Sequence, residues 1–268
     1  MRRRGQGLSV KDYLLSRYPG DENRIFIGRM MEYLDRCERT RQRIFTDFLH
    51  PLQVKIATEL AKSQSSVQLD FHGGFEDAER RMAVFLPDWD SVQSEEFPIV
   101  ILKMTDRGWS RTLSHRDFLG ALLGLGIKRE KMGDLLVRER ICFAAVHRDI
   151  AGFLETNLER AGRSSLIVQR AAGEDLHIEP KYNEMRITVA SPRLDGVVGA
   201  VFGLSRAKAA GLIKGEKVKQ NWEIEIRTDT ALQQGDIVSV GGKGKFKVGE
   251  FAGVTKKGRS VMVIKRYI

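Results

Sequence analysis

Arg193 and Asp195 stand two positions apart, directly after Pro192, and are the residues best suited to chemistry. A carboxylate can act as the nucleophile in covalent catalysis. The same carboxylate can instead accept hydrogen bonds from the free N–H groups at the start of a helix. The residues that follow Asp195, GVVGAVF, are apolar and helical in pattern. Asp195 is therefore predicted to cap this helix or to orient an arginine, with a catalytic role as the alternative.

A second helix with basic flanks is predicted in the same stretch. Gly203 ends the first helix, and Ser205 caps the second one, RAKAAGLIK. A helix N-terminus attracts anions through its free N–H groups and its dipole, and nearby cationic side chains strengthen that attraction. A strand, EKVKQN, and a lysine-rich hairpin follow, and lysines alternate along both. A phosphate-bearing ligand is the natural partner of this stretch.

The distribution of charge points to the same region. The chain of 268 residues has a formal net charge of +10. Residues 191–268 carry 15 Lys and Arg against 7 Asp and Glu, whereas residues 51–190 carry 19 against 21. A basic module on a nearly neutral body is typical of a polyanion-binding protein. The residues predicted to contact RNA are Arg193, Asp195, Ser205, Arg206, Lys208, Lys214, Lys217, Lys219, Asn221, Lys243 and Lys245, with Lys247 extending the row.

Other kinds of site find little support in the sequence. Two distant cysteines, Cys37 and Cys142, match no metal spacing and favour a reducing, cytoplasmic setting. No metal and no cofactor are predicted, because the five histidines are scattered and are expected to be surface or cap residues. No stretch is long and apolar enough for a spanning helix, so no membrane partner is expected. The histidines are His50, His72, His115, His147 and His177.

The elements that must position these residues form an α/β (α+β) chain of three predicted domains. Residues 1–78 are a helix-rich N-terminal domain, with helices over about 22–43 and 51–62 and a strand in SVQLDFH. A short helical turn, EDAERR, spans the boundary to the second domain, residues 79–187, and leads into the strand MAVFLP. The second domain then runs β-α-β-β-α-β, the ferredoxin-like order that RNA-recognition domains share. Only Phe143 could stack on a base there, so this domain is interpreted as a scaffold or docking surface. Residues 188–268 form the basic module.

The basic module resembles the S-four RNA-binding domain. The likeness spans RLDGVVGAVFGLSRAKAAGLIKGEKVKQN and the later GDIVSV, and it departs from the usual pattern at Trp222, where Asn is normally followed by Gly. FLHP, GGFEDAERR, GIKREKMGDLLV and SPRLD, in this order, make the whole chain similar to the YlmH family of bacterial proteins. That resemblance implies a non-enzymatic protein bound to ribosomal RNA and tRNA. It also implies a role in quality control on large ribosomal subunits that hold peptidyl-tRNA, with quality-control or cell-division factors as further partners.

Two alternatives follow from the same residues. Arg-Leu-Asp resembles the catalytic triplet of pseudouridine synthases, which would make the chain an RNA-modifying enzyme. In those enzymes, however, the triplet continues differently, whereas GVVGAVF builds the RNA-binding helix itself. The second alternative is an adaptor of the cell-division machinery, for which RNA would be dispensable.

Overall fold

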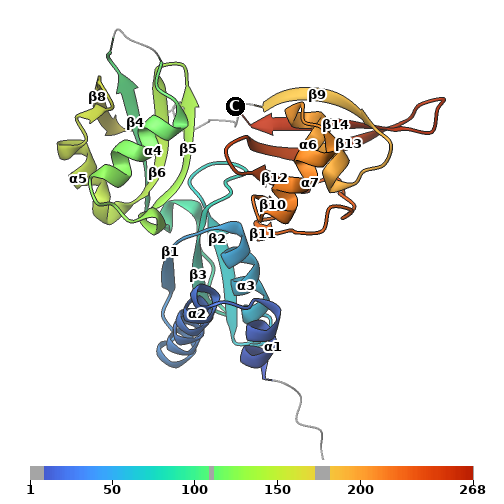
Figure 1. The fold of residues 1–268 in the computed structure, drawn as a ribbon. Coiled ribbons are helices and arrows are strands. Elements are labelled where there is room, and N and C mark those ends of the chain that lie inside the picture. The colour runs from blue at the N-terminus through green and yellow to red at the C-terminus, as the bar shows by residue number, and fades with distance from the viewer. Residues whose placement is uncertain (1–8, 109–111, 173–181, 268) are drawn as a thin grey trace, which may run out of the picture. The chain divides into compact units, whose positions relative to one another are not determined.

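The computed structural model describes residues 9–108, 112–172 and 182–267 (Figure 1). The chain divides into two compact units, Met1–Glu179 and Pro180–Ile268. Both mix helices with antiparallel sheets, so the fold class is α+β, as predicted. The division into three domains stays a prediction, and both of its internal boundaries are placed differently by the strand pairings described below.

Unit 1 begins with three helices and a three-stranded antiparallel sheet of order β1-β3-β2. These elements are α1 (Val10–Arg17), α2 (Asp21–Thr40), β1 (Ile44–Leu49), α3 (Pro51–Ala61), β2 (Val67–His72) and β3 (Arg81–Pro87). The sequence placed β3 in the middle domain, but β3 is the central strand of this first sheet. The first domain therefore extends past residue 78, to the end of β3.

Two local features of the first domain also differ from the predictions. Arg41 adopts a left-handed conformation with φ 56°, which ends α2 at Thr40 and turns the chain into β1. The helix predicted to reach about residue 43 is thus shorter, and a strand follows it that was not predicted. The stretch EDAERR forms turns rather than a helical turn, because its backbone is held by a carboxylate from another part of the chain. The Asp134 carboxylate accepts from the amide of Glu79 at 2.6 Å.

The middle part of unit 1 has the ferredoxin-like order that the sequence predicts. Its sheet runs β5-β6-β4-β8-β7, all antiparallel, with both helices on one face. The elements are β4 (Ile99–Asp106), α4 (His115–Gly124), β5 (Met132–Arg138), β6 (Ile141–His147), α5 (Arg148–Asn157), β7 (Arg160–Ala161) and β8 (Ser164–Arg170). Ser114 and Asp117 form the capping box that starts α4. α5 ends at Asn157, and the next residues, 160–161, pair with β8.

Apolar side chains join the two sheets of unit 1. In β3 alternate residues point to opposite faces: Phe85 packs under the N-terminal helices, whereas Met82 and Val84 face the other way. One buried cluster contains Met82 and Val84 from the first sheet together with Ile101 and Phe143 from the middle sheet. Both faces of β3 are thus buried, which explains why its sequence is a continuous apolar run.

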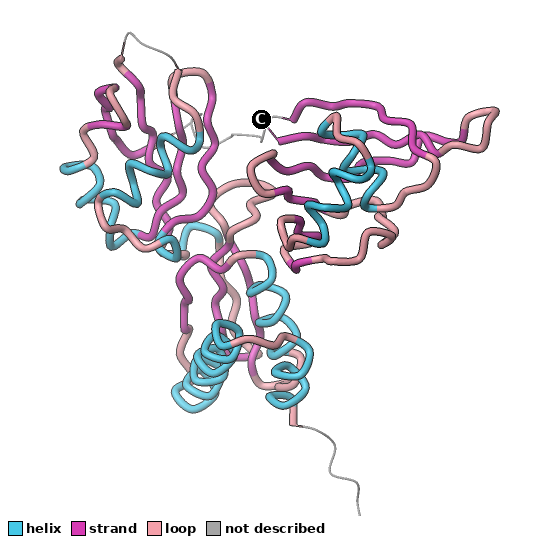
Figure 2. Tube along the Cα trace, in the orientation of Figure 1, coloured by secondary structure: helices cyan, strands magenta, loops and turns pink. Residues whose placement is uncertain are grey.

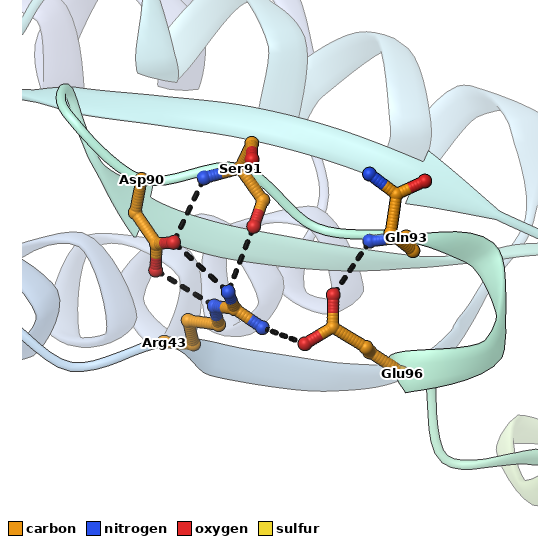
Figure 3. Close-up of polar contacts among 5 residues, drawn as sticks. All are labelled: Arg43, Asp90, Ser91, Gln93 and Glu96. Carbon is orange, nitrogen blue, oxygen red and sulfur yellow. Dashed lines mark hydrogen bonds and ion pairs between the residues drawn. The ribbon is translucent and has the colours of Figure 1, made fainter.

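Polar contacts reinforce the connection between β3 and β4. Figure 3 shows the Arg43 guanidinium donating to both carboxylate oxygens of Asp90, at 2.7 and 2.9 Å, and to the Ser91 carbonyl oxygen. The same guanidinium pairs with Glu96, whose carboxylate also accepts from the Gln93 amide. The segment that leaves β3 is therefore tied to the start of β1.

Unit 2 is a six-stranded antiparallel sheet of order β11-β10-β12-β13-β14-β9, with two helices packed on one face (Figure 2). Its elements are β9 (Tyr182–Val189), α6 (Leu194–Phe202), α7 (Arg206–Lys214), β10 (Val218–Gln220), β11 (Glu223–Ile224), β12 (Ile237–Val240), β13 (Gly244–Val254) and β14 (Ser260–Tyr267). The predicted boundary between residues 187 and 188 leaves most of β9 in the middle domain. β9 instead pairs along its whole length with β14, so it is the edge strand of this sheet.

No single helix among the described residues is both long enough and apolar enough to cross a membrane. α6 and α7 together pass a test of length and composition, with a bend of 115° between them. In unit 2 these two helices bury Val197, Val201 and Ile213 against the sheet.

Candidate nucleic-acid interface

The Asp195 carboxylate is the centre of the predicted site, and it lies buried between two arginines. Arg206 Nε donates to Asp195 Oδ2 at 2.9 Å, and Arg193 lies 3.4 Å from the same carboxylate. The Gly196 amide donates to Oδ1 at 2.7 Å. The Asp195 side chain is only 5% exposed, whereas that of Arg206 is 63% exposed. The buried acid therefore holds two guanidiniums whose outer edges face solvent.

Electrostatics keep this carboxylate ionised. Burial raises the pKa of Asp195, but hydrogen bonds from Arg206, Arg193 and the Gly196 amide outweigh burial and hold the pKa below its ordinary value. A carboxylate buried in this way has both oxygens engaged and no open approach for a substrate. The structure thus gives Asp195 the role of an arginine-orienting residue.

The cap predicted for α6 is wrong in detail. Arg193, not Asp195, holds the N-cap position, and its side chain makes no capping bond. The first amides of α6 are used by a neighbouring loop: those of Leu194 and Asp195 donate to the Thr230 and Thr228 carbonyls at 2.9 and 3.0 Å. The α6 N-terminus is therefore satisfied within the chain. Asp195 anchors side chains rather than helix amides, apart from its bond with Gly196.

The start of α7 matches the prediction. Ser205 is the N-cap and accepts from the Lys208 amide at 3.3 Å. Arg206 and Lys208 both lie in the first turn and are exposed, and Gly203 ends α6 with φ 62°. This helix start combines a capped backbone with two cationic side chains, an arrangement that suits a phosphate group. Lys214 is exposed at the opposite end of α7.

The remaining predicted lysines do not share one surface with α7. Val218, Val238 and Phe246 face the core beneath the helices, so their neighbours Lys219 and Lys245 point to the opposite face of the sheet. Lys217 directly precedes β10, and Lys243 lies in the turn before β13, both exposed. The structure therefore divides the predicted set between the helical side and the open side of unit 2.

Asn221 has a structural task that the sequence did not reveal. Its side-chain amide donates to Asp236 Oδ1 at 2.8 Å, and its side-chain oxygen accepts from the Ile237 amide at 3.0 Å. Asn221 and Trp222 both have positive φ, 49° and 67°, which identifies a type I′ turn between β10 and β11. Both ends of the Asn221 amide thus hold this turn against β12.

The middle sheet lacks the exposed aromatic face used by RNA-recognition domains. Phe143 is 6% exposed and packs with Phe48, Met82 and Val84 of the first sheet. The face on which bases stack in those domains is therefore buried within unit 1. This burial agrees with the interpretation of the middle domain as a scaffold, and it explains why Phe143 cannot read a base in this fold.

Arg80, in the stretch GGFEDAERR, has the charge for an RNA contact but serves a structural role. Arg80 donates to the carbonyls of Phe48, Arg129 and Met132 at 3.0 to 3.2 Å. Burial is the main cause that lowers the pKa of Arg80, to about 10. Arg80 thus joins the first sheet to the middle one.

Histidines serve as caps, and no metal site appears in the parts of the chain that the structure describes. Nδ1 of His50 accepts from the Gln53 amide, and Nδ1 of His147 accepts from the Asp149 amide. These contacts support the predicted cap role at both positions. No group of three or more His, Cys, Asp or Glu residues there could hold a metal ion. His177 lies outside the described residues.

Comparisons with known proteins agree with these boundaries. Residues 22–88 match a family model described as "YlmH, N-terminal", and residues 93–175 match one described as "Putative RNA-binding domain in YlmH". Ribosome-associated protein quality control protein P2 of Bacillus subtilis (strain 168) is 31% identical over 237 residues, covering 88% of this chain and 92% of that protein. The structure of cell division protein ylmH from Streptococcus pneumoniae is 22% identical, with a TM-score of 0.51 over 57% of this chain and 93% of that one, a likeness of fold. With this length of shared sequence and both family domains present, the chain belongs to the YlmH family.

Proposed function

We propose that this protein binds structured RNA on the ribosome, and that unit 2 is an S-four module that supplies most of the contact. The observation that carries the proposal is the Arg193–Asp195–Arg206 cluster beside the exposed first turn of α7. A buried carboxylate that fixes two arginines reduces the entropy each loses on binding a phosphate, and arginine can bind phosphate in a bidentate way. We define Arg193, Arg206 and Lys208 as the helix-side surface.

The finer part of the proposal concerns the RNA and the process. Structured ribosomal RNA or tRNA on large subunits that carry peptidyl-tRNA is the proposed target, and ribosome-associated quality control is the proposed process. The name of the Bacillus subtilis relative supports this process. The localisation proposed with it is cytoplasmic. No enzymatic activity is proposed, because Asp195 has both oxygens bound by donors, and the matching families carry no enzymatic name.

One point separates the proposal from the family description. That description attaches RNA binding to residues 93–175, whereas charge and geometry favour unit 2. The helix-side surface and the middle domain can be told apart by substitution in the full-length protein.

The test is co-sedimentation of the full-length protein with purified ribosomal subunits across a salt series. In the double variant Arg193→Ala, Arg206→Ala we expect ribosome affinity to fall by roughly tenfold to a hundredfold, because each lost charge-assisted contact contributes about 1.5–3 kcal/mol and the contacts share a carboxylate. Arg36→Ala with Arg39→Ala, exposed on α2, is the matched control and should bind as the wild type does. If the Arg193→Ala, Arg206→Ala variant keeps its circular dichroism spectrum and binds ribosomes as tightly as the wild type, RNA recognition lies in another domain.

Salt dependence provides the second measurement. If about five phosphates are neutralised, the slope of log K against log salt should be roughly −3.5 to −4.5. The helix-side double variant should lose about two phosphate contacts and thus about 1.4 to 1.8 of that slope. A slope near zero for the wild type would contradict phosphate recognition altogether.

A further inference from the structure

Unit 2 has a second surface that neither the family descriptions nor the helix-side surface uses. On β13, β14 and β9 the core residues Phe246, Val248, Met262, Ile264 and Ile187 pack beneath α6 and α7. Their neighbours along each strand point to the other side of the sheet. We call this side the open face.

Positive charge dominates the open face. Arg186, Lys245, Lys247 and Lys265 lie on three adjacent strands, and Glu184 and Glu250 are the acids beside them. Lys247 is directly opposite Lys265 in the β13–β14 ladder. Like charges at opposed positions destabilise a sheet, and the Lys265–Glu184 ion pair at 3.3 Å offsets this only in part. An anionic partner would relieve the repulsion between Lys247 and Lys265, so this part of the sheet is suited to bind one.

Two tyrosines continue the same face. Tyr182 and Tyr267 are opposed at the end of the β9–β14 ladder, with ring centroids 4.9 Å apart and planes at 76°. Lys245 Nζ lies 4.0 Å from the centre of the Tyr267 ring, and Lys265 Nζ lies 5.9 Å from that of Tyr182. Aromatic rings beside cationic side chains are the combination on which single-stranded nucleic acids bind, with bases stacked on rings and phosphates near cations.

A groove runs along the open face next to the tyrosines. It has a volume of about 1100 Å³ and is lined by Arg186, Lys247 and Lys265, among others. Gly249 forms part of its floor, and a Cβ atom there would lie 2.9 Å from the Val263 carbonyl oxygen. Only glycine fits this position without a shift of backbone, so the groove keeps its depth through close approach of two strands.

We propose that the open face of unit 2 binds a single-stranded RNA segment, with phosphates along Arg186, Lys247 and Lys265 and a base on the Tyr182–Tyr267 pair. The open face and the helix-side surface lie on opposite sides of one sheet. One protein molecule can therefore hold a folded RNA and an unpaired strand at the same time. The inference rests on the proposed function, because unit 2 is taken to bind RNA. It adds a second binding surface, for single-stranded RNA instead of folded RNA.

The experiment measures binding of the full-length protein to two fluorescent probes, an oligouridine of about ten nucleotides and a folded tRNA. In Tyr182→Leu with Tyr267→Leu, which keeps apolar bulk and removes the rings, oligouridine affinity should fall roughly tenfold. In Lys247→Gln with Lys265→Gln, the salt slope for oligouridine should decrease by about 1.4. This second variant removes a like-charge pair, so its fold should be retained.

Controls separate this inference from the proposed function. Lys62→Gln with Lys128→Gln removes two exposed lysines from unit 1 and should leave oligouridine binding unchanged. Arg206→Ala should weaken tRNA binding. It should leave the oligouridine affinity within about twofold of the wild-type value, a change in binding free energy much smaller than the loss of one contact. If both open-face variants bind oligouridine as tightly as the wild type, the inference is overturned. If the wild type still binds tRNA in that case, the proposed function is retained. Failure of the wild type to bind either probe overturns both.

Discussion

The middle sheet of unit 1 and the sheet of unit 2 are built alike, with two helices on one face, yet their other faces have opposite fates. In the middle sheet that face carries Phe143 and Ile101, which are buried against the first sheet. In unit 2 it carries Lys245, Lys247 and Lys265. A strand buried on both faces reads as a continuous apolar run, whereas one with a solvated face alternates. ICFAAV and GKFKV show this difference directly in the sequence.

The largest expected effect on stability comes from removing a large side chain from the buried face of the middle sheet. Phe143→Ala should lower the free energy of unfolding of unit 1 by about 3–5 kcal/mol, through lost burial and the cavity that remains. Tyr267→Ala, on the half-buried counterpart in unit 2, should cost far less stability. Denaturant titrations of both full-length variants check this, with hydrogen exchange in β6 reporting on unit 1. Equal losses in the two variants would mean that the faces do not differ as described.

Arg80 offers the next sharpest test, because it secures the covered face. Arg80→Met leaves the carbonyls of Phe48, Arg129 and Met132 without their charged donor, at an expected cost on the order of 3 kcal/mol. Arg80→Lys, with a single donor head, should recover part of this stability. RNA affinity measured where both variants are folded should not change, and a loss of affinity at full stability would restore Arg80 as an RNA contact.

The third prediction concerns Asp195 and the stability of unit 2. Its folded-state pKa lies below the ordinary value, so its contribution to stability is present above about pH 4 and is lost as pH falls through the lower folded-state value. Asp195→Asn should therefore cost about 1–2 kcal/mol near neutral pH. The gap from the wild type should narrow in thermal melts as the pH falls below about 4. A gap that is constant with pH would contradict the ion pairs with Arg193 and Arg206.

The smallest expected effect is at the edge of the unit 2 sheet. Trp222 has φ 67° in the turn after Asn221, a conformation that costs a non-glycine residue about 1–2 kcal/mol. Trp222→Gly should remove this conformational cost. Glycine loses more backbone entropy on folding, which offsets part of the gain, so the free energy of unfolding should rise by about 0.5 kcal/mol. Chemical denaturation followed by circular dichroism measures the change. A lower stability would show that packing of the indole outweighs the turn geometry.

The sequence was sufficient where structure is local. The β-α-β-β-α-β order, the Ser205 cap and the Gly203 stop all depend on residues within a few positions of one another. β1 was missed because the reversal at Arg41 uses a left-handed residue that is not glycine. β3 and β9 lie on the other side of the predicted domain boundaries from the sheets that they join. For β9 the reason is that its partner, β14, is distant in sequence.

The candidate site was predictable in composition but not in arrangement. Lysine alternation correctly placed Lys219 opposite Val218. It could not show that α6 and α7 cover the other side, so that Lys245 and Arg206 lie on different surfaces. Asn221 was predicted as an RNA contact from its place in a motif, but its hydrogen bonds connect it to Asp236 and Ile237, which follow it by a turn and a loop.

The pairing of β9 with β14 has a consequence for synthesis of the protein. β9 leaves the ribosome first, but its partner follows only after the chain has run from Val189 to Ser260. Until then β9 has no ladder on either edge, and the groove bounded by Arg186 and Lys265 does not exist. Sheets closed by such distant pairings form late. A nascent chain would thus complete the open face only once β14 has been made, and the core beneath α6 and α7, which includes Met262 and Ile264 of β14, is completed at the same point.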